Sequence, residues 1–314
     1  MALLTTSRPL YLDAQTFHTL LKLQGPSLAL WRAAEVAVLR EQVYGEGKVY
    51  RRDMAYGGDM VYGKGKAYEE DKAYRRDMAY GGDMVYGEGM APARGATTNL
   101  LRPILDLGCG DGLVTSQVLR RVEVGLDPDE KVLKRAAQMG IYERFEAVPA
   151  EEMRLADASI GTVVSNSVLE HLPRLDAVLE AVARVLRPGG RLLFTVPTEA
   201  FSKWLVLPVA RYAAWRNGQL CHLHLWPVER WVSHLERVGL EVEEVRPYLR
   251  HELVAAWDAL ELLQQIWVFR RRLVSMVWHR IPSPVLERMA CWASHIDLSA
   301  PGPGGGRLVV ARKR

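Results

Sequence analysis

Residues 102–112 read R-P-I-L-D-L-G-C-G-D-G, an apolar segment that runs directly into alternating glycines. Ile104–Leu107 predicts a buried strand, and Leu113–Arg121 predicts a helix directly after the glycines. Glycines at 108, 110 and 112 lack a Cβ atom, so the backbone there can approach a ligand, and the helix start presents free N–H groups. The stretch therefore predicts a strand, a tight turn and a helix. A glycine-rich turn alone specifies no particular ligand.

A carboxylate follows the next predicted strand and limits which ligands the glycine-rich turn could bind. Val122–Leu126 ends in Asp127, about 20 residues beyond the turn, where an acid can accept both hydroxyls of a ribose. The dinucleotide pattern G-x-G-x-x-G would need glycine at the position of Leu113, and Asp106 beside the turn would repel a pyrophosphate. The same acid suits a cationic ligand. S-adenosylmethionine, with its sulfonium, its amine, its carboxylate and its ribose diol, is the ligand that these residues favour.

Four ordered segments of the chain resemble the class I S-adenosylmethionine-dependent methyltransferases of the type 11-like kind. They are I-L-D-L-G-C-G-D-G (104–112), G-L-D-P (125–128), V-V-S-N-S-V-L-E-H-L (163–172) and R-V-L-R-P-G-G-R-L-L-F-T-V-P (184–197). The resemblance is strong over about residues 100 to 198 and rests on pattern alone beyond them. It implies a three-layer α/β sandwich with a Rossmann-like, mostly parallel seven-stranded sheet, whose last strand is antiparallel, plus a helical C-terminal insertion. It also implies methyl transfer from S-adenosylmethionine to an oxygen, nitrogen or carbon atom of a small-molecule or lipid-linked acceptor.

Carried over position by position, the resemblance implies a set of cofactor-binding residues. They are Asp106, Gly108 and Gly110 on the methionine side, Asp127 at the ribose, Ala150 and Glu151 beside the adenine, and Asn166 and Ser167 in the pocket wall. For Asn166 and Ser167, capping of a turn is the alternative. Two departures stand out: Pro149 replaces the usual acid before the alanine, and Gly161 replaces an aspartate at the entry to the fourth strand, which weakens that strand.

Histidines supply the candidates for a general base. His171 lies in L-E-H-L, and His224 precedes a predicted helix at 227–238; a local hydrogen bond is the alternative role for His171. In O-methyltransferases of quinone biosynthesis a related E-x-x-E-H stretch is associated with a divalent metal, but Ser167 stands at the first Glu position here. His222 and His224 alternate as strand neighbours do, yet no third ligand is apparent, so we predict no metal site.

The predicted organisation has three parts: an N-terminal helical segment (1–43), a low-complexity insert (44–98), and the methyltransferase domain (99–314). In the insert a tyrosine recurs every six residues from Tyr44 to Tyr86, without Leu, Ile, Phe or Trp, so we expect disorder, with stacked β-hairpins as the alternative. Residues 27–40 predict an amphipathic helix whose apolar face packs on the domain. Helical insertions are expected at 198–226 and 250–300.

Residues 253–278 carry an apolar stripe with Trp267 and Trp278, and with Asp258 and Glu261 largely off it. A lid or dimer face is one interpretation of the stretch 252–280, and peripheral contact with a membrane is the other. The net charge is +4 without a long basic tract, and there are three scattered cysteines. We therefore expect a cytoplasmic protein, peripherally attached to a membrane if at all, with no nucleic-acid partner; the oligomeric state stays open.

Two other functions fit the same residues. A noncatalytic protein that binds S-adenosylmethionine could use the tyrosine-rich tract as an interaction module. A nicotinamide oxidoreductase is the second alternative, and Leu113 is the objection to it.

Overall fold

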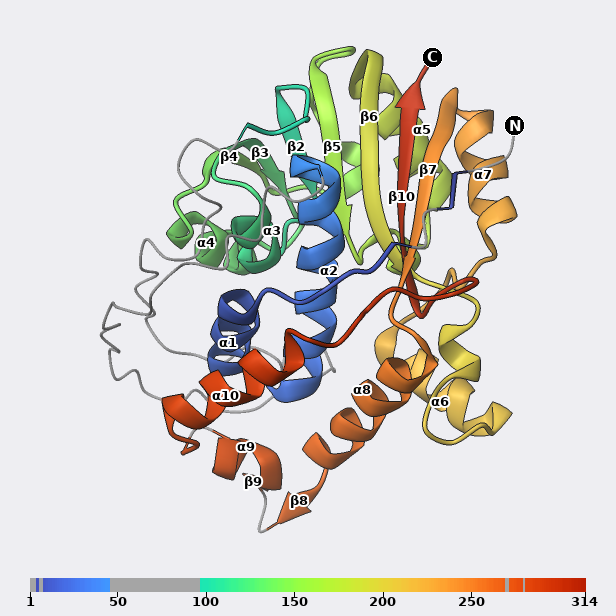
Figure 1. Ribbon diagram of the computed structural model, residues 1–314. Coiled ribbons are helices and arrows are strands. Elements are labelled where there is room, and N and C mark those ends of the chain that lie inside the picture. Colours follow the sequence, from blue (N-terminus) through green and yellow to red (C-terminus); the bar gives the residue numbers. More distant parts are fainter. Residues whose placement is uncertain (1–3, 6–7, 46–96, 269–270, 279) are drawn as a thin grey trace.

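The computed structural model of the chain describes residues 4–5, 8–45, 97–268, 271–278 and 280–314 (Figure 1). Of the predicted insert 44–98, all but Tyr44, Gly45 and residues 97–98 lies outside the described residues. Among these described residues, eight strands form the main sheet in the order β1-β7-β10-β6-β5-β2-β3-β4. They are β1 (Leu4–Thr5), β2 (Ile104–Leu107), β3 (Val122–Leu126), β4 (Tyr142–Glu146), β5 (Ile160–Asn166), β6 (Leu186–Pro197), β7 (Leu240–Tyr248) and β10 (Gly306–Lys313).

The sheet confirms the predicted fold class. Neighbouring strands are parallel except at β10, which is antiparallel to both β6 and β7. Seven of the strands match the prediction, and the two-residue β1 adds an eighth beside β7. Because β2, β3, β4 and β5 run the same way, their carboxyl ends lie at one edge, where ligands of such sheets bind.

Helices cover both faces of the sheet and give it three layers (Figure 1). Successive side chains of β10 point to opposite faces of the sheet. Leu308 and Val310 belong to the buried cluster on one face, and Val309 and Ala311 belong to the buried cluster on the other. On the first side lie α1 (Ala14–Leu23), α2 (Pro26–Tyr44), α3 (Leu113–Val118), α8 (His251–Gln264) and α10 (Ser283–Ala293). On the second side lie α5 (Leu175–Val185) and α7 (Val228–Arg237). The remaining helices are α4 (Glu130–Gln138), α6 (Ala210–Leu220) and α9 (Leu273–Trp278), with the short helices η2 (Ala150–Glu152), η3 (Leu169–His171) and η4 (Phe201–Lys203).

The helix predicted at 27–40 is α2, and it is buried on nearly all sides rather than along one stripe. It packs against α3, where Arg40 Nε donates to the Gln117 carbonyl at 2.8 Å and the Tyr44 hydroxyl donates to the Val118 carbonyl at 2.8 Å. A helix enclosed in this way can bring polar side chains into the interior only if they find partners there.

The segment between β7 and β10 does not form the single apolar stripe that the sequence predicted for residues 253–278. Helix α8 ends at Gln264, and Trp267 lies in the two-residue strand β8 (Trp267–Val268), which pairs with β9 (Arg271–Arg272). Asp258, which the sequence analysis placed largely off the buried stripe, is wholly buried. Its carboxylate is buried because Arg216 of α6 pairs with it at 2.8 Å. Sequence periodicity cannot show such a partner, which lies in another insertion.

One other local expectation needs correction, and a second position shows why glycine is required. The helix after the glycines ends at Val118, three residues before the predicted Arg121, because Leu119 is already extended on the way to β3. The strand through Gly161 forms as β5, which begins at Ile160, and its pairing with β6 shifts register between Ile160 and Thr162. A Cβ atom at Gly161 would lie 2.5 Å from the Leu101 carbonyl oxygen, so the close approach of that backbone requires glycine there.

Within the described residues, no helix combines the length and the apolar character that crossing a bilayer requires.

Candidate functional site

The glycine loop after β2 is held to the end of the neighbouring strand β3. The backbone N–H groups of Gly108 and Cys109 both donate to the Leu126 carbonyl, at 2.8 and 3.0 Å. Gly108 and Gly110 have φ angles of +71° and +55°, which L-residues with a side chain rarely adopt. A Cβ atom on Gly110 would meet nothing within 4 Å. The loop therefore presents bare backbone to open space at the carboxyl edge of the sheet.

Asp127 follows β3 and braces this loop. Its Oδ2 accepts a hydrogen bond from the Gly110 N–H at 3.2 Å, and its Oδ1 accepts one from the Asp129 N–H at 3.0 Å. The residue predicted to hold a ribose is therefore positioned by the same loop that would receive the rest of the ligand.

Asp106, one residue before the end of β2, is buried and acts electrostatically on Cys109 of the loop. The Tyr142 hydroxyl donates to its Oδ2 at 2.6 Å. Burial raises the pKa of Asp106 to about 6 and nearby Asp127 adds to the effect, while hydrogen bonds from Tyr142 and Thr115 oppose it. This carboxylate gives the loop a negative charge at neutral pH, and that charge is lost as the pH falls through about 6.

The raised pKa predicts how stability changes with pH. Between the ordinary aspartate pKa of 3.8 and about 6, the folded chain binds more protons at Asp106 than the unfolded chain does. The free energy of unfolding should therefore decrease as the pH rises through this window, by on the order of 2 kcal/mol, and then level off. Urea denaturation of the wild type and of Asp106→Asn across the window measures the difference. Parallel pH profiles for the two proteins would contradict the assignment.

Asn166, the last residue of β5, and Ser167, which follows it, both donate hydrogen bonds to a residue that precedes them by more than 100 positions in the sequence. Glu35 of α2 is 0% exposed and accepts a hydrogen bond from Asn166 Nδ2 at 2.8 Å and another from the Ser167 hydroxyl. It also accepts bonds from Trp31 Nε1 at 2.8 Å and Arg32 Nη1 at 3.1 Å. This carboxylate therefore clamps the end of β5 against α2.

A substitution that keeps the shape of Glu35 but removes its charge tests the clamp. In Glu35→Gln an amide NH₂ must face donor groups, so we expect a loss of about 1–3 kcal/mol in the free energy of unfolding. Glu229→Gln, on the surface helix α7, serves as the control and should change stability by less than about 0.5 kcal/mol. Equal denaturation midpoints for the two variants would refute the clamp.

The remaining positions of the predicted cofactor set lie elsewhere on the same edge. Ala150 is buried and begins the short helix η2, and Glu151 pairs with Arg174 at 3.6 Å. The Glu151 side chain is thus held by Arg174, a residue that does not belong to the glycine loop. The residues predicted to bind cofactor form three groups, one at the glycine loop with Asp106 and Asp127, one at η2, and one at the end of β5.

The histidines do not form the strand pair weighed from the sequence. Residues 222–226 form no strand; His222 packs on Phe201 at 5.2 Å between ring centroids, whereas His224 packs on Trp226 at 4.5 Å. His224 Nε2 lies 2.8 Å from the Leu172 carbonyl oxygen, so it donates that proton to the backbone. This bond also brings His224 to the loop that follows η3.

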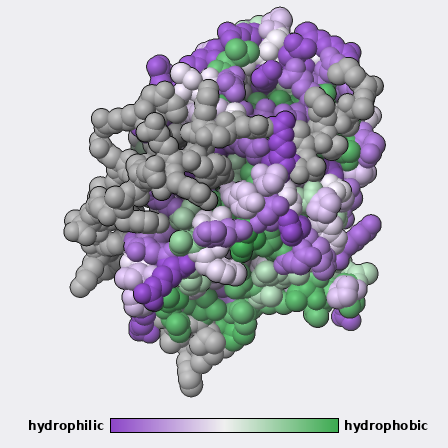
Figure 2. Space-filling view, viewed as in Figure 1, coloured by the Kyte–Doolittle hydropathy of each residue, from purple (hydrophilic) through white to green (hydrophobic). Residues whose placement is uncertain are grey.

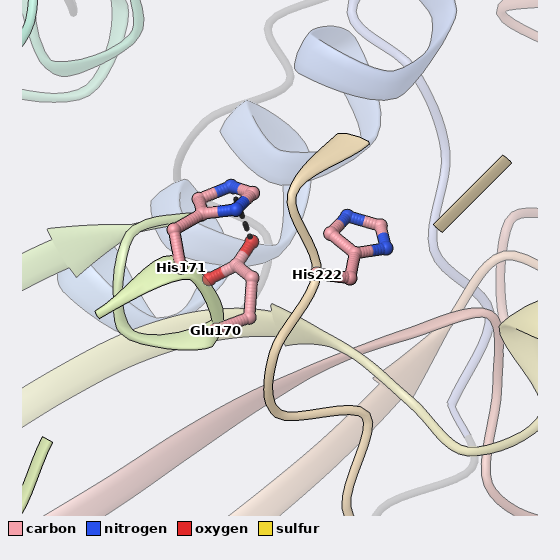
Figure 3. A group of neighbouring side chains, drawn as sticks. All are labelled: Glu170, His171 and His222. Atoms are coloured by element: carbon pink, nitrogen blue, oxygen red, sulfur yellow. Dashed lines mark ion pairs between the residues drawn. The ribbon is translucent and has the colours of Figure 1, made fainter. Parts of the chain in front are cut away.

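Instead, His222 lies beside the two residues of L-E-H-L that the sequence analysis weighed as ligands. Figure 3 shows Glu170 and His171 together on η3, with His222 opposite them from the segment after α6. His171 Nε2 is 3.6 Å from Glu170 Oε1, and the two imidazoles stack with centroids 5.4 Å apart. Burial raises the pKa of Glu170 to about 8, and burial with nearby His171 and Arg216 lowers the pKa of His222 to about 3.

Sequence reasoning missed Arg32, Glu35 and His222 as site residues. Glu35 lies within the predicted helix 27–40, and a charged residue among apolar neighbours was the available signal. His222 was paired with His224 because alternation was the only geometry that the sequence offered.

Part of this chain is similar in sequence to known proteins. Residues 105–194 match the family model described as a methyltransferase domain. The chain is 34% identical over 93 residues to a ubiquinone biosynthesis O-methyltransferase of Agrobacterium fabrum, covering 28% of this chain and 37% of that protein. It is 30% identical over 178 residues to 27-O-demethylrifamycin SV methyltransferase of Amycolatopsis mediterranei, covering 52% of this chain and 63% of that protein. A solved S-adenosylmethionine dependent methyltransferase of Mesorhizobium loti shares 20% identity and a TM-score of 0.40, covering 67% of this chain and 90% of its own.

Residues 105–194 match a methyltransferase domain, and the strand order around them agrees with the fold that the sequence resemblance implies. The cofactor that goes with this domain is S-adenosylmethionine, as the sequence predicts. The loop fits it, because Asp127 binds the Gly110 N–H beside the open space over Gly110, and the buried Asp106 acts electrostatically on Cys109 of the same loop. The chain spans less than two thirds of the length of the curated relatives it matches.

Proposed function

We propose that this protein transfers the methyl group of S-adenosylmethionine to a small-molecule acceptor. The observation that carries the proposal is the loop at Gly110, braced by Asp127 within a segment that matches a methyltransferase domain. The curated relatives quoted above are named as methyltransferases of a ubiquinone pathway and of a rifamycin, and the first is named an O-methyltransferase. We therefore favour an oxygen atom of the acceptor over a nitrogen or carbon atom.

The residues of the loop would hold the donor rather than activate it. Asp127 would accept the ribose hydroxyls, Asp106 would supply negative charge near the cationic methionine end, and Asn166 would lie at the pocket wall. The sulfonium supplies a methyl group that is already activated, so alignment of donor and acceptor is the main task of the chain. Such positioning can contribute about 7–11 kcal/mol to catalysis. A base such as His171 or His224 would be needed chiefly for a hydroxyl acceptor.

A thermal shift experiment tests the ligand first. S-adenosylhomocysteine should raise the melting temperature of the full chain, and NAD should not, because only a ligand of the folded state stabilises it. Incorporation of labelled methyl from the donor into soluble and lipid extracts, assayed separately, then tests turnover. Stabilisation without any turnover would favour the noncatalytic alternative, and stabilisation by NAD alone would overturn the proposal.

We also propose that a lipid-linked acceptor is reached at a membrane surface through the predicted stretch 252–280 together with α10. Figure 2 shows apolar surface gathered at the lower end of the molecule, where α9 and α10 lie in Figure 1. The exposed apolar side chains of this region are Leu263, Ile266, Val277, Val285, Met289 and Trp292. Trp292 is 71% exposed, and the nearby Arg280 and Arg288 are exposed cations that suit anionic headgroups.

Co-sedimentation with vesicles tests this contact. The chain should bind vesicles that contain phosphatidylglycerol more strongly than pure phosphatidylcholine, and Trp292→Ser should reduce the bound fraction. Trp215→Ser is the matched control, because Trp215 is exposed on α6 instead. Equal loss in both variants, or no binding by the wild type, would rule out this surface.

A further inference from the structure

The cluster of Glu170, His171 and His222 has the composition of a metal site that the sequence analysis did not predict. Each residue offers one ligand atom, and the three atoms all lie within 4.8 Å of one another. Glu170 and His171 come from η3, whereas His222 follows α6 about fifty residues later, so the fold supplies the third ligand that the linear pattern lacked (Figure 3).

An unpartnered atom points to a missing ligand in this cluster. Glu170 is 1% exposed, and its Oε2 is buried without a hydrogen-bond partner among the described residues. A buried carboxylate oxygen without a partner is costly, and native proteins usually satisfy it with a proton donor, an ordered water or a cation. The neighbouring imidazoles make a cation the natural partner, because they add two nitrogen ligands at the same place.

Backbone and side-chain contacts orient the two imidazoles. His171 Nδ1 lies 3.0 Å from the Cys221 carbonyl oxygen, which accepts its proton, so Nε2 keeps the lone pair on the side of Glu170. His222 Nδ1 lies 3.4 Å from Asn217 Oδ1. An Nδ1–H bond of this kind sets the tautomer and ring direction of most metal-binding histidines. Cys221 and Asn217 would then act as supports of the ligands.

The charges around the cluster do not oppose a cation. Glu35 and Arg32 both act on Glu170, and they form an ion pair with each other at 3.1 Å. Arg216 acts on His222, but the Asp258 carboxylate neutralises it at 2.8 Å. Because these four charges pair with one another, the negative charge of ionised Glu170 is the one in this group that a bound cation would balance.

We propose that Glu170, His171 and His222 bind one divalent transition-metal ion, such as Zn²⁺, Mn²⁺ or Fe²⁺. Two imidazoles and one carboxylate suit these ions better than Mg²⁺ or Ca²⁺, and three protein ligands leave a position open. Bonds of about 2.0–2.1 Å from the metal require the ligand atoms to close to about 3.3 Å, which rotation of the side chains can supply. Metal binding does not depend on the proposed methyl transfer. If that transfer occurs, the open position would offer a Lewis acid to a hydroxyl acceptor, a role that rests on the proposed function.

Titration of the untagged, metal-free full chain with Co²⁺ tests the proposal through the visible absorption of the bound ion. We expect one Co²⁺ per chain, with affinity reduced at least tenfold in Glu170→Gln and in His222→Ala. His295→Ala is the matched control, because His295 is exposed beyond the end of α10, and it should bind as the wild type does. No saturable binding by the wild type, or undiminished binding by both site variants, would overturn the proposal.

Two further measurements keep the result interpretable. If His222→Ala does not fold, His222→Asn takes its place, and Co²⁺ must in any case raise the melting temperature of the wild type. Binding of S-adenosylhomocysteine is measured on the same metal-free preparations. Loss of that binding would count against the proposed function, whereas loss of Co²⁺ binding alone would count against the metal site.

Discussion

Asp127→Ala is expected to weaken the binding of S-adenosylmethionine by on the order of 100-fold or more. The variant would lose the acceptor of both ribose hydroxyls, and hydrogen bonds to a charged group contribute about 1.5–3 kcal/mol each. It would also release the Gly110 N–H, which Asp127 Oδ2 holds at 3.2 Å, so the loop would lose its brace. Isothermal titration calorimetry with S-adenosylmethionine and S-adenosylhomocysteine measures the loss.

Asp129→Ala provides the matched control two residues away. Asp129 is exposed and accepts a bond from the Lys131 N–H at 2.8 Å at the start of α4, so its loss should alter helix stability slightly and affinity by no more than a few fold. If Asp127→Ala folds normally and binds the cofactor as tightly as Asp129→Ala does, the pocket is assigned to the wrong residues.

Asp258→Ala is expected to lower the free energy of unfolding by about 3–5 kcal/mol, because it removes the carboxylate that is hydrogen-bonded to a buried guanidinium and leaves Arg216 only Glu261, at 3.8 Å. Arg216 and Asp258 are both 0% exposed, and they join α6 to α8. The same carboxylate also accepts hydrogen bonds from the Tyr212 hydroxyl at 2.7 Å and the Val206 N–H at 3.0 Å. Urea denaturation monitored by tryptophan fluorescence measures the change.

Two comparisons separate this buried pair from ordinary surface charges. Glu241→Ala breaks an exposed pair with Arg314 and should cost less than about 1 kcal/mol. The double variant Arg216→Met with Asp258→Leu replaces both charges by apolar groups and should regain much of the lost stability. An Asp258→Ala variant no less stable than Glu241→Ala would show that the pair does not hold the two insertions together.

The sequence alone predicted the class of the fold and the main cofactor loop. Alternating apolar runs and glycines at 108, 110 and 112 act over a few residues, so they can be read without knowing what packs against them. The structure then confirmed the parallel strands and the antiparallel β10. The roles of the individual site residues stay predictions until ligand binding is measured.

Local pattern, therefore, was sufficient for the sheet and for the glycine turn, because the steric freedom of glycine and the periodicity of apolar residues are properties of short segments. Only the tertiary structure showed what Glu35, Asp258 and His222 do. Each of these polar residues is stabilised by groups distant in the sequence: Asn166 for Glu35, Arg216 for Asp258, and His171 for His222. A buried charge or an imidazole takes its role from its partners, and the chain brings those partners together only when it folds.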